Sequence, residues 1–177
     1  MSVTIERERL GQETVPHKKS MILLLAGILA LAVGFGSIAG GVFGAWYTWN
    51  QAVVQDVTTP SDAVIADTPV RGPFTMWAEA DIITFHQLDR TEGLYYAQMP
   101  REVPQLDEAG APVVENGETV MVPNQARASW FDATTLTTAL SLGIISYALS
   151  VFAMVVGLTL AFTGYVFLQI RRKAVLL

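Results

Sequence analysis

Two long stretches without a charged residue constrain the fold of this chain more than any other feature. They are residues 21–46 and 133–170. An α-helix rises about 1.5 Å per residue, so about 20 apolar residues cross the roughly 30 Å hydrocarbon core of a bilayer. Both stretches are longer, so we predict two transmembrane α-helices, at residues 21–46 and 132–170. A signal peptide is the alternative for the first stretch, but its apolar region would be only about 7–15 residues long.

The charges predict how the chain is oriented. Four basic residues precede the first stretch and three follow the second: Arg7, Arg9, Lys18, Lys19, Arg171, Arg172 and Lys173. The segment between has thirteen carboxylates against four arginines, a net charge of −9. Basic residues stay on the cytoplasmic side. We therefore predict cytoplasmic tails at residues 1–20 and 171–177 and an extracytoplasmic domain at residues 47–131, in the plasma membrane. A domain this acidic is not expected to bind nucleic acid.

Both predicted helices carry small residues four positions apart, which lie on one helical face. In lipid, helices associate through close packing, and small side chains let two backbones approach. We therefore predict six helix-packing residues: Gly36, Gly40, Gly44, Ala153, Gly157 and Ala161. Whether they pack the two helices on each other or on another protein stays open. The alternative is that glycine is simply common in membrane helices.

Aromatic residues lie near the predicted outer ends of both helices. Tryptophan and tyrosine rings are enriched at the boundary between lipid and water. We predict an interface belt on the extracytoplasmic side formed by Trp46, Tyr47, Trp49 and Trp130.

The segment between the helices predicts a small α+β domain. Pro73 and Gly93 suit the start and stop of a helix at about residues 74–92. The dipeptide Asn116-Gly117 suits the turn of a β-hairpin at about residues 112–122, and we expect the chain before it to be irregular or extended. Asp132 is the expected N-cap of the second long helix.

The residues offer little for catalysis. There is no cysteine, and the two histidines, His17 and His86, are expected on opposite sides of the membrane. A metal site needs several converging ligands, so we predict no enzyme, no cofactor and no metal site. A metal site of His86 with Asp81, Asp89 or Glu79 is the alternative.

One block of the outer segment resembles a known family. The segment VRGPFTMWAEADIITFHQLDRTEGLYYAQMPRE contains its residues Gly72, Pro73, Phe74, Thr75, Ala80, Asp81, Ile82, Ile83, His86, Thr91, Gly93, Tyr96 and Ala97. ARASWFDATTL follows as a lead into the second helix. Together they resemble small actinobacterial proteins with two membrane helices, over about residues 55–170. Such proteins are often labelled aromatic ring-opening dioxygenases, but that chemistry needs iron ligands that this chain lacks.

The resemblance implies an accessory subunit of the actinobacterial cytochrome bcc–aa3 respiratory supercomplex. The hairpin Val113–Val122 looks like an insertion relative to the family pattern. We therefore expect a non-catalytic subunit whose partners are membrane lipids and cytochrome bcc–aa3 subunits. The alternative is a stand-alone envelope protein whose outer domain binds a ligand or cell-wall component through Trp77, Phe85, Tyr95 and Tyr96.

Overall fold

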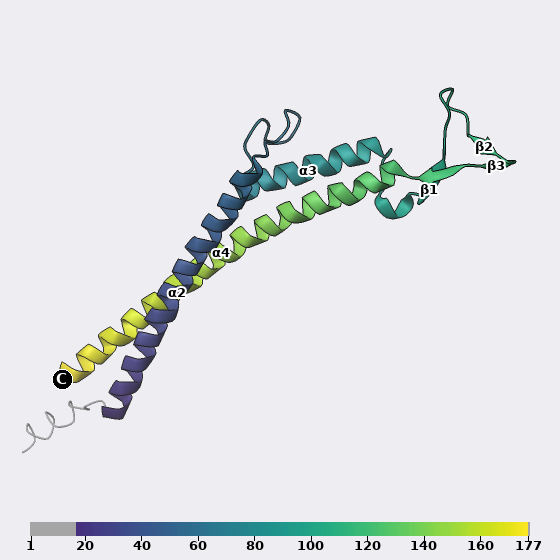
Figure 1. Ribbon diagram of the computed structural model, residues 1–177. Coiled ribbons are helices and arrows are strands. Elements are labelled where there is room, and N and C mark those ends of the chain that lie inside the picture. The colour runs from purple at the N-terminus through teal and green to yellow at the C-terminus, as the bar shows by residue number, and fades with distance from the viewer. Residues whose placement is uncertain (1–16, 177) are drawn as a thin grey trace, which may run out of the picture. The chain divides into compact units, whose positions relative to one another are not determined.

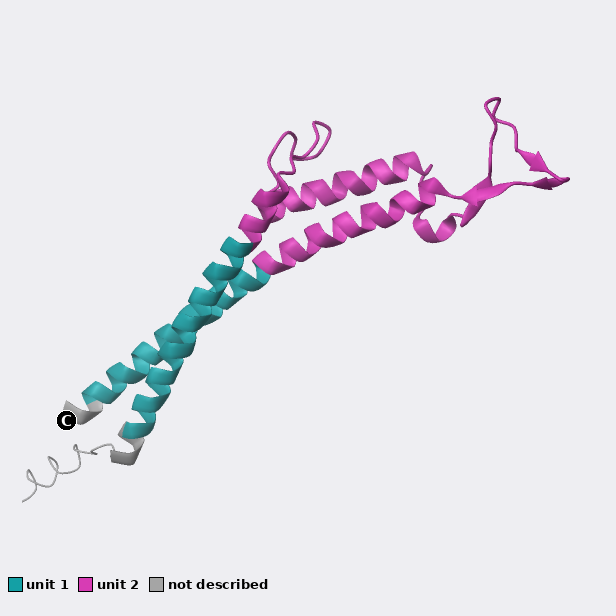
Figure 2. Ribbon diagram, viewed as in Figure 1, with its two compact units in different colours: residues 1–47, 148–177 teal, residues 48–147 magenta. Residues whose placement is uncertain are grey.

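The computed structural model describes residues 17–176, and the side chains of residues 21–173. The chain forms two compact units (Figure 2), unit 1 from residues 1–47 and 148–177 and unit 2 from residues 48–147. The elements in chain order (Figure 1) are α2 (His17–Gln55), α3 (Pro73–Arg90), the short 3-10 helix η1 (Tyr96–Gln98), β1 (Glu102–Pro104), β2 (Val114–Glu115), β3 (Glu118–Thr119), β4 (Met121–Pro123) and α4 (Gln125–Leu176). Two long apolar helices with a small helical and sheet region between them agree with the predicted order of elements.

Helices α2 and α4 are long and apolar enough to cross a membrane. They extend beyond the predicted spans of 21–46 and 132–170, because each helix continues into polar sequence at its ends. Residues 17–20 and 171–176, predicted as parts of cytoplasmic tails, are helical. The rest of those tails, residues 1–16 and 177, lies outside the described residues.

Asn124, rather than Asp132, is the N-cap of helix α4. Its Oδ1 accepts a hydrogen bond from the backbone N–H of Arg127 at 3.1 Å, and its Nδ2 donates to the carbonyl of Pro100 at 3.1 Å. The first N–H groups of a helix have no partner within the helix, and an asparagine side chain satisfies one of them. Asp132 lies inside the helix, eight residues after the N-cap that the structure shows.

In unit 2, helix α3 runs alongside the first part of α4 (Figure 2). A Cβ on Gly143 of α4 would lie 2.7 Å from the sulfur of Met76, at the start of α3. At the other end of α3, Gln87 Nε2 donates to Ser129 Oγ at 2.7 Å. Contacts in this order make the two helices antiparallel. The buried hydrophobic residues of the unit are Ala63, Val70, Met76, Ala78, Ile82, Trp130 and Ala133.

Helix α3 spans residues 73–90, close to the predicted 74–92. Thr75 Oγ1 accepts from the backbone N–H of Gly72 at 3.2 Å, just before the helix. Gly93 follows its end with a φ of 81°, and its N–H donates to the carbonyl of Leu88 at 2.8 Å. Glu92, just before Gly93, is already left-handed with a φ of 55°, and glycine continues in this conformation without steric cost, so the helix ends here.

The loop between α2 and α3 is tied together by one buried threonine. Thr59 is 1% exposed, and its hydroxyl donates to the carbonyl of Ile65 at 2.5 Å. Its Oγ1 also accepts from the backbone N–H of Thr68 at 3.0 Å. These bonds hold the loop in a compact form.

The hairpin has its turn at Asn116-Gly117, where both φ angles are positive, 52° and 84°. This is the conformation that a two-residue hairpin turn requires. Strands β2 and β3 flank the turn, and β1 pairs antiparallel with β4, with Val103 opposite Val122. Strand β1 lies in sequence predicted to be irregular or extended. Its three residues are too few to show an alternating pattern.

Candidate functional site

Unit 1 is held together by glycines. On α2, Gly27, Gly34 and Gly41 are buried, and on α4 so are Ser150, Gly157 and Gly164. Both sets are spaced seven residues apart. We call these six residues the glycine seam.

The two backbones of the glycine seam are in direct contact. A Cβ added to Gly34 would lie 2.7 Å from the carbonyl oxygen of Gly157, and one on Gly157 would lie 2.6 Å from the carbonyl oxygen of Gly34. The same holds for Gly164, at 2.7 Å from the carbonyl oxygen of Gly27. Such distances leave no room for a side chain. A seven-residue repeat keeps one helical face against a partner over several turns, so it is suited to a long helix pair.

The predicted packing residues only partly coincide with the glycine seam. Gly157 belongs to it, and the backbone of Ala161 lies against Gly34. Gly44 would place a Cβ 2.7 Å from Ser150 Oγ. Ala153 is half-buried.

Gly36 and Gly40 are not part of the contact with α4. Both are exposed, and a Cβ on either would have nothing within 4 Å. The physical reason is the helical period: these residues lie on a different face from Gly34 and Gly41 at 3.6 residues per turn. The spacing of seven from Gly27 to Gly41 was the sequence signal for the seam. We call Gly36 and Gly40 the free stripe.

Three of the four predicted belt residues are exposed. They are Trp46, Tyr47 and Trp49, at the end of the apolar part of α2. In unit 2, Thr48 Oγ1 lies 2.6 Å from Ser146 Oγ, which fixes α2 beside α4 at this level.

Trp130, the fourth residue predicted for the belt, is buried. It is only 6% exposed, its ring stacks on Tyr95 with centroids 5.4 Å apart, and its Nε1 donates to the carbonyl of Leu94 at 2.9 Å. Ser146 and Trp130 are sixteen residues apart on α4, about 24 Å along the helix. Trp130 is therefore far from the level of Thr48 and is a core residue of unit 2.

The aromatic residues considered for a ligand site are divided between two places. Tyr95 stacks on Trp130, and the guanidinium of Arg127 lies 3.8 Å from the ring centroid of Tyr96. Trp77 and Phe85 are exposed on α3 instead. The four side chains therefore do not line a common site.

His86 pairs with an acidic residue that the sequence did not suggest. Its Nε2 lies 2.6 Å from Oδ2 of Asp62, in the loop before α3. This hydrogen bond lowers the pKa of the Asp62 carboxyl. Burial raises the pKa of Glu79, whose Oε2 is buried without a hydrogen-bond partner. Among residues 21–173, no three His, Asp or Glu side chains are grouped as metal ligands.

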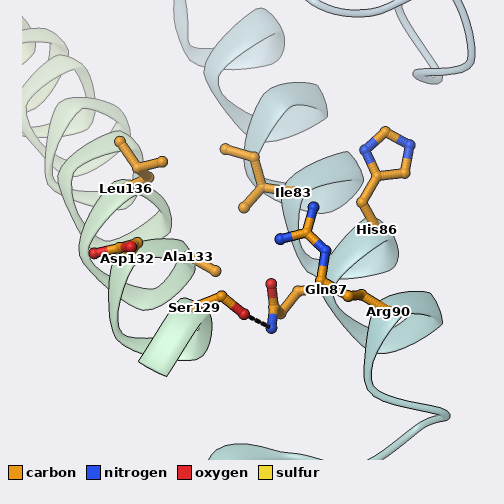
Figure 3. A pocket seen from close by; sticks show the side chains of 8 residues that line it. All are labelled: Ile83, His86, Gln87, Arg90, Ser129, Asp132, Ala133 and Leu136. Atoms are coloured by element: carbon orange, nitrogen blue, oxygen red, sulfur yellow. Dashed lines mark hydrogen bonds between the residues drawn. The ribbon is translucent and has the colours of Figure 1, made fainter. Parts of the chain in front are cut away.

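An open hollow of about 250 Å³ lies between α3 and α4 (Figure 3). Its lining residues are Ile83, His86, Gln87, Arg90, Ser129, Asp132, Ala133 and Leu136. The hydrogen bond from Gln87 to Ser129 joins the two helices across it. Among the described residues, no hydrogen bond of this lining pairs a nucleophile with a base.

Comparisons with known proteins returned no matching family model, no matching curated protein and no matching solved structure. The function is therefore inferred from the residues and contacts of this chain.

Proposed function

We propose that this protein is a non-catalytic, membrane-anchored accessory subunit of a larger membrane protein complex. Helices α2 and α4 span the bilayer with both termini in the cytoplasm, and unit 2 lies on the extracytoplasmic side. The supports for this orientation are the basic residues at both ends of the chain and the net charge of −9 between the helices.

The free stripe is the observation that carries the proposal. The two helices are paired through the glycine seam, so Gly36 and Gly40 are not needed for folding. They nevertheless form a small-residue face on an apolar helix. In lipid, such a face lets the backbone of another helix come close, whereas a large side chain would prevent it. The free stripe is therefore the docking face for a helix of the complex.

We further propose that the complex is the actinobacterial cytochrome bcc–aa3 supercomplex. The support is the resemblance of the Gly72–Ala97 block and of the lead ARASWFDATTL. In this role the protein braces an extracytoplasmic surface of the complex and takes no part in electron transfer.

Replacing Gly40 with leucine tests the docking face. A leucine there fills the space for a partner helix and leaves the glycine seam intact. We expect recovery of cytochrome subunits with the affinity-tagged protein, in mild detergent, to fall about tenfold, the effect of a loss of about 1.4 kcal/mol. Val42→Leu is the control and is expected to keep full recovery. Val42 is exposed, and two residues from Gly40 it lies about 200° further around the helix, away from the free stripe and outside the glycine seam.

Two results would contradict the proposal. If the unaltered protein recovers a membrane complex without cytochrome subunits, the supercomplex assignment is wrong. If Gly40→Leu recovers the same amount of complex as Val42→Leu, the free stripe is not the docking face.

A further inference from the structure

Besides the free stripe on α2, the chain has a larger exposed face on helix α4, within unit 2. Phe131, Thr135, Thr138, Leu142 and Ile145 follow one another at alternating spacings of four and three residues, and all are exposed. We call these five residues the α4 stripe. Its three large side chains, Phe131, Leu142 and Ile145, are 70%, 60% and 53% exposed.

Helix α3 does not cover the α4 stripe. The contacts between these helices are made by other residues of α4, which include Ser129 and Gly143. Alternating spacings of four and three are the pattern by which one helix packs on another over several turns. The α4 stripe therefore has the geometry of a helix-packing face without a helix on it.

The length of the charge-free run places the α4 stripe outside the lipid. Residues 133–170 of α4 would be about 57 Å long, nearly twice the roughly 30 Å hydrocarbon core. With Arg171 at the cytoplasmic surface, about 20 residues fill the core, so the lipid ends near residue 150. The contact of Ser146 with Thr48, next to the exposed Trp46 and Trp49, gives the same level. The α4 stripe then faces water, where an exposed apolar face is unfavourable.

We infer that the α4 stripe docks on a helix of another membrane protein that continues beyond the outer surface of the bilayer alongside α4. This inference rests on the proposed membrane placement and names the chemistry of the partner. The contact face of the partner helix is apolar and uncharged, because the α4 stripe itself contains no charge. Lysine or arginine residues border that face, because unit 2, to which the stripe belongs, has a net charge of −9.

The same charge argues against a second copy of this chain. Two copies joined through their α4 stripes would bring two acidic segments of −9 together, and like charges on facing surfaces repel. A basic partner is attracted by the same negative charge.

The test compares two exposed leucines of the full-length protein in its native membranes. Leu142 lies in the α4 stripe, whereas Leu136 lines the hollow beside α3. We expect Leu142→Glu to lower recovery of the complex about tenfold and Leu136→Glu to change it less than about twofold. A photoreactive amino acid at position 142 is expected to link to a transmembrane helix of a partner, within its first turns outside the lipid. Lys or Arg should flank the linked residues.

The outcomes separate this inference from the proposed function. If Gly40→Leu releases the complex but Leu142→Glu does not, the α4 stripe is not a docking face, while the accessory role stands. A cross-linked product with twice the chain mass of 19.2 kDa would identify a second copy as the occupant and overturn the inference. Cross-links only to lipid, or only to a soluble protein, would overturn it as well.

Discussion

Helix α4 packs against a different partner in each unit, and the two contacts are built in different ways. In unit 1 it meets α2 through glycines, with the two backbones in contact. In unit 2 it meets α3 through side chains: Met76 lies against Gly143, and Gln87 hydrogen-bonds to Ser129. The glycine seam needs side chains to be absent, whereas the contact in unit 2 needs them to be present.

The proposed placement of unit 1 in lipid and of unit 2 in water explains the difference. In water, burying large apolar side chains stabilises a fold, and unit 2 buries Met76, Ile82 and Trp130. In lipid that driving force is missing, because acyl chains are as apolar as the side chains. Unit 1 therefore turns large residues such as Leu25 and Phe35 outward and keeps its smallest residues inside. The contrast makes opposite substitutions damaging in the two units.

Removal of a large buried side chain is expected to have the largest effect, and it should be confined to unit 2. Trp130→Ala loses the stacking on Tyr95 and the hydrogen bond to Leu94, and we expect a loss of about 3–5 kcal/mol in free energy of unfolding. Titration with a denaturing detergent, followed by circular dichroism, measures it. Trp130→Phe keeps a ring and is expected to cost less. An unchanged midpoint for Trp130→Ala would mean that unit 2 does not depend on side-chain burial.

Addition of a side chain is expected to damage unit 1 instead. Gly34→Leu must push α2 away from Gly157 and Ala161, and we expect a loss of about 1–3 kcal/mol in the same titration. Gly36→Leu is the matched control, since nothing lies within 4 Å of its added Cβ, and it should leave the midpoint unchanged. Equal losses for both variants would contradict the assignment of the seam.

A smaller effect is expected at the start of α4. Asn124→Ala removes the acceptor for the N–H of Arg127, which should cost about 1 kcal/mol, the usual value of an N-cap. Asp132→Ala, at the position predicted from the sequence, is the control and should be neutral. Thermal unfolding in mild detergent compares the two. A larger loss of stability for Asp132→Ala than for Asn124→Ala would indicate that the helix begins at Asp132.

The smallest effect should come from Glu79 and depend on pH. Burial raises its pKa above the ordinary value of 4.5, so the folded state prefers the protonated form. The charged form therefore costs stability at pH above the raised pKa, and this cost disappears as the pH falls below about 4.5. We expect Glu79→Gln to raise stability by no more than about 0.5 kcal/mol at pH 7 and not at all at pH 4. A stabilisation at pH 4 equal to that at pH 7 would rule out charge as the cause.

The long helices, α3 and the hairpin could be predicted because each has a local signal in the sequence. The apolar runs are much longer than a soluble helix needs, Pro73 and Gly93 bracket α3, and Asn116-Gly117 specifies a tight turn. The pairing of β1 with β4 could not, because it joins two segments of three residues far apart in the chain. Such pairing depends on tertiary contacts rather than on local preference.

At the candidate site, local features of the sequence did not show which residues contact each other. The spacing of four between Gly36 and Gly40 is a familiar pattern of close helix contact. The contact between α2 and α4, however, follows the spacing of seven. Trp130 has the residue type and the sequence position expected of a belt residue, and only the fold shows that its ring stacks on Tyr95. The proximity of Asp62 and His86 depends on the path of a loop, which no spacing in the sequence indicates.

The residues of the glycine seam are evenly spaced, so the seam alone does not determine how far α2 is shifted along α4. Sliding α2 along α4 by seven residues, about 10 Å, would set Gly34 beside Gly164 and Gly41 beside Gly157, but it would bring Gly27 against the large side chain of Arg171. The hydroxyl pair of Thr48 and Ser146 would also be broken, because Thr48 would then lie near Ala153. A single polar pair can select one alignment among several of similar packing. Thr48 and Ser146 therefore help to select the native alignment of α2 with α4.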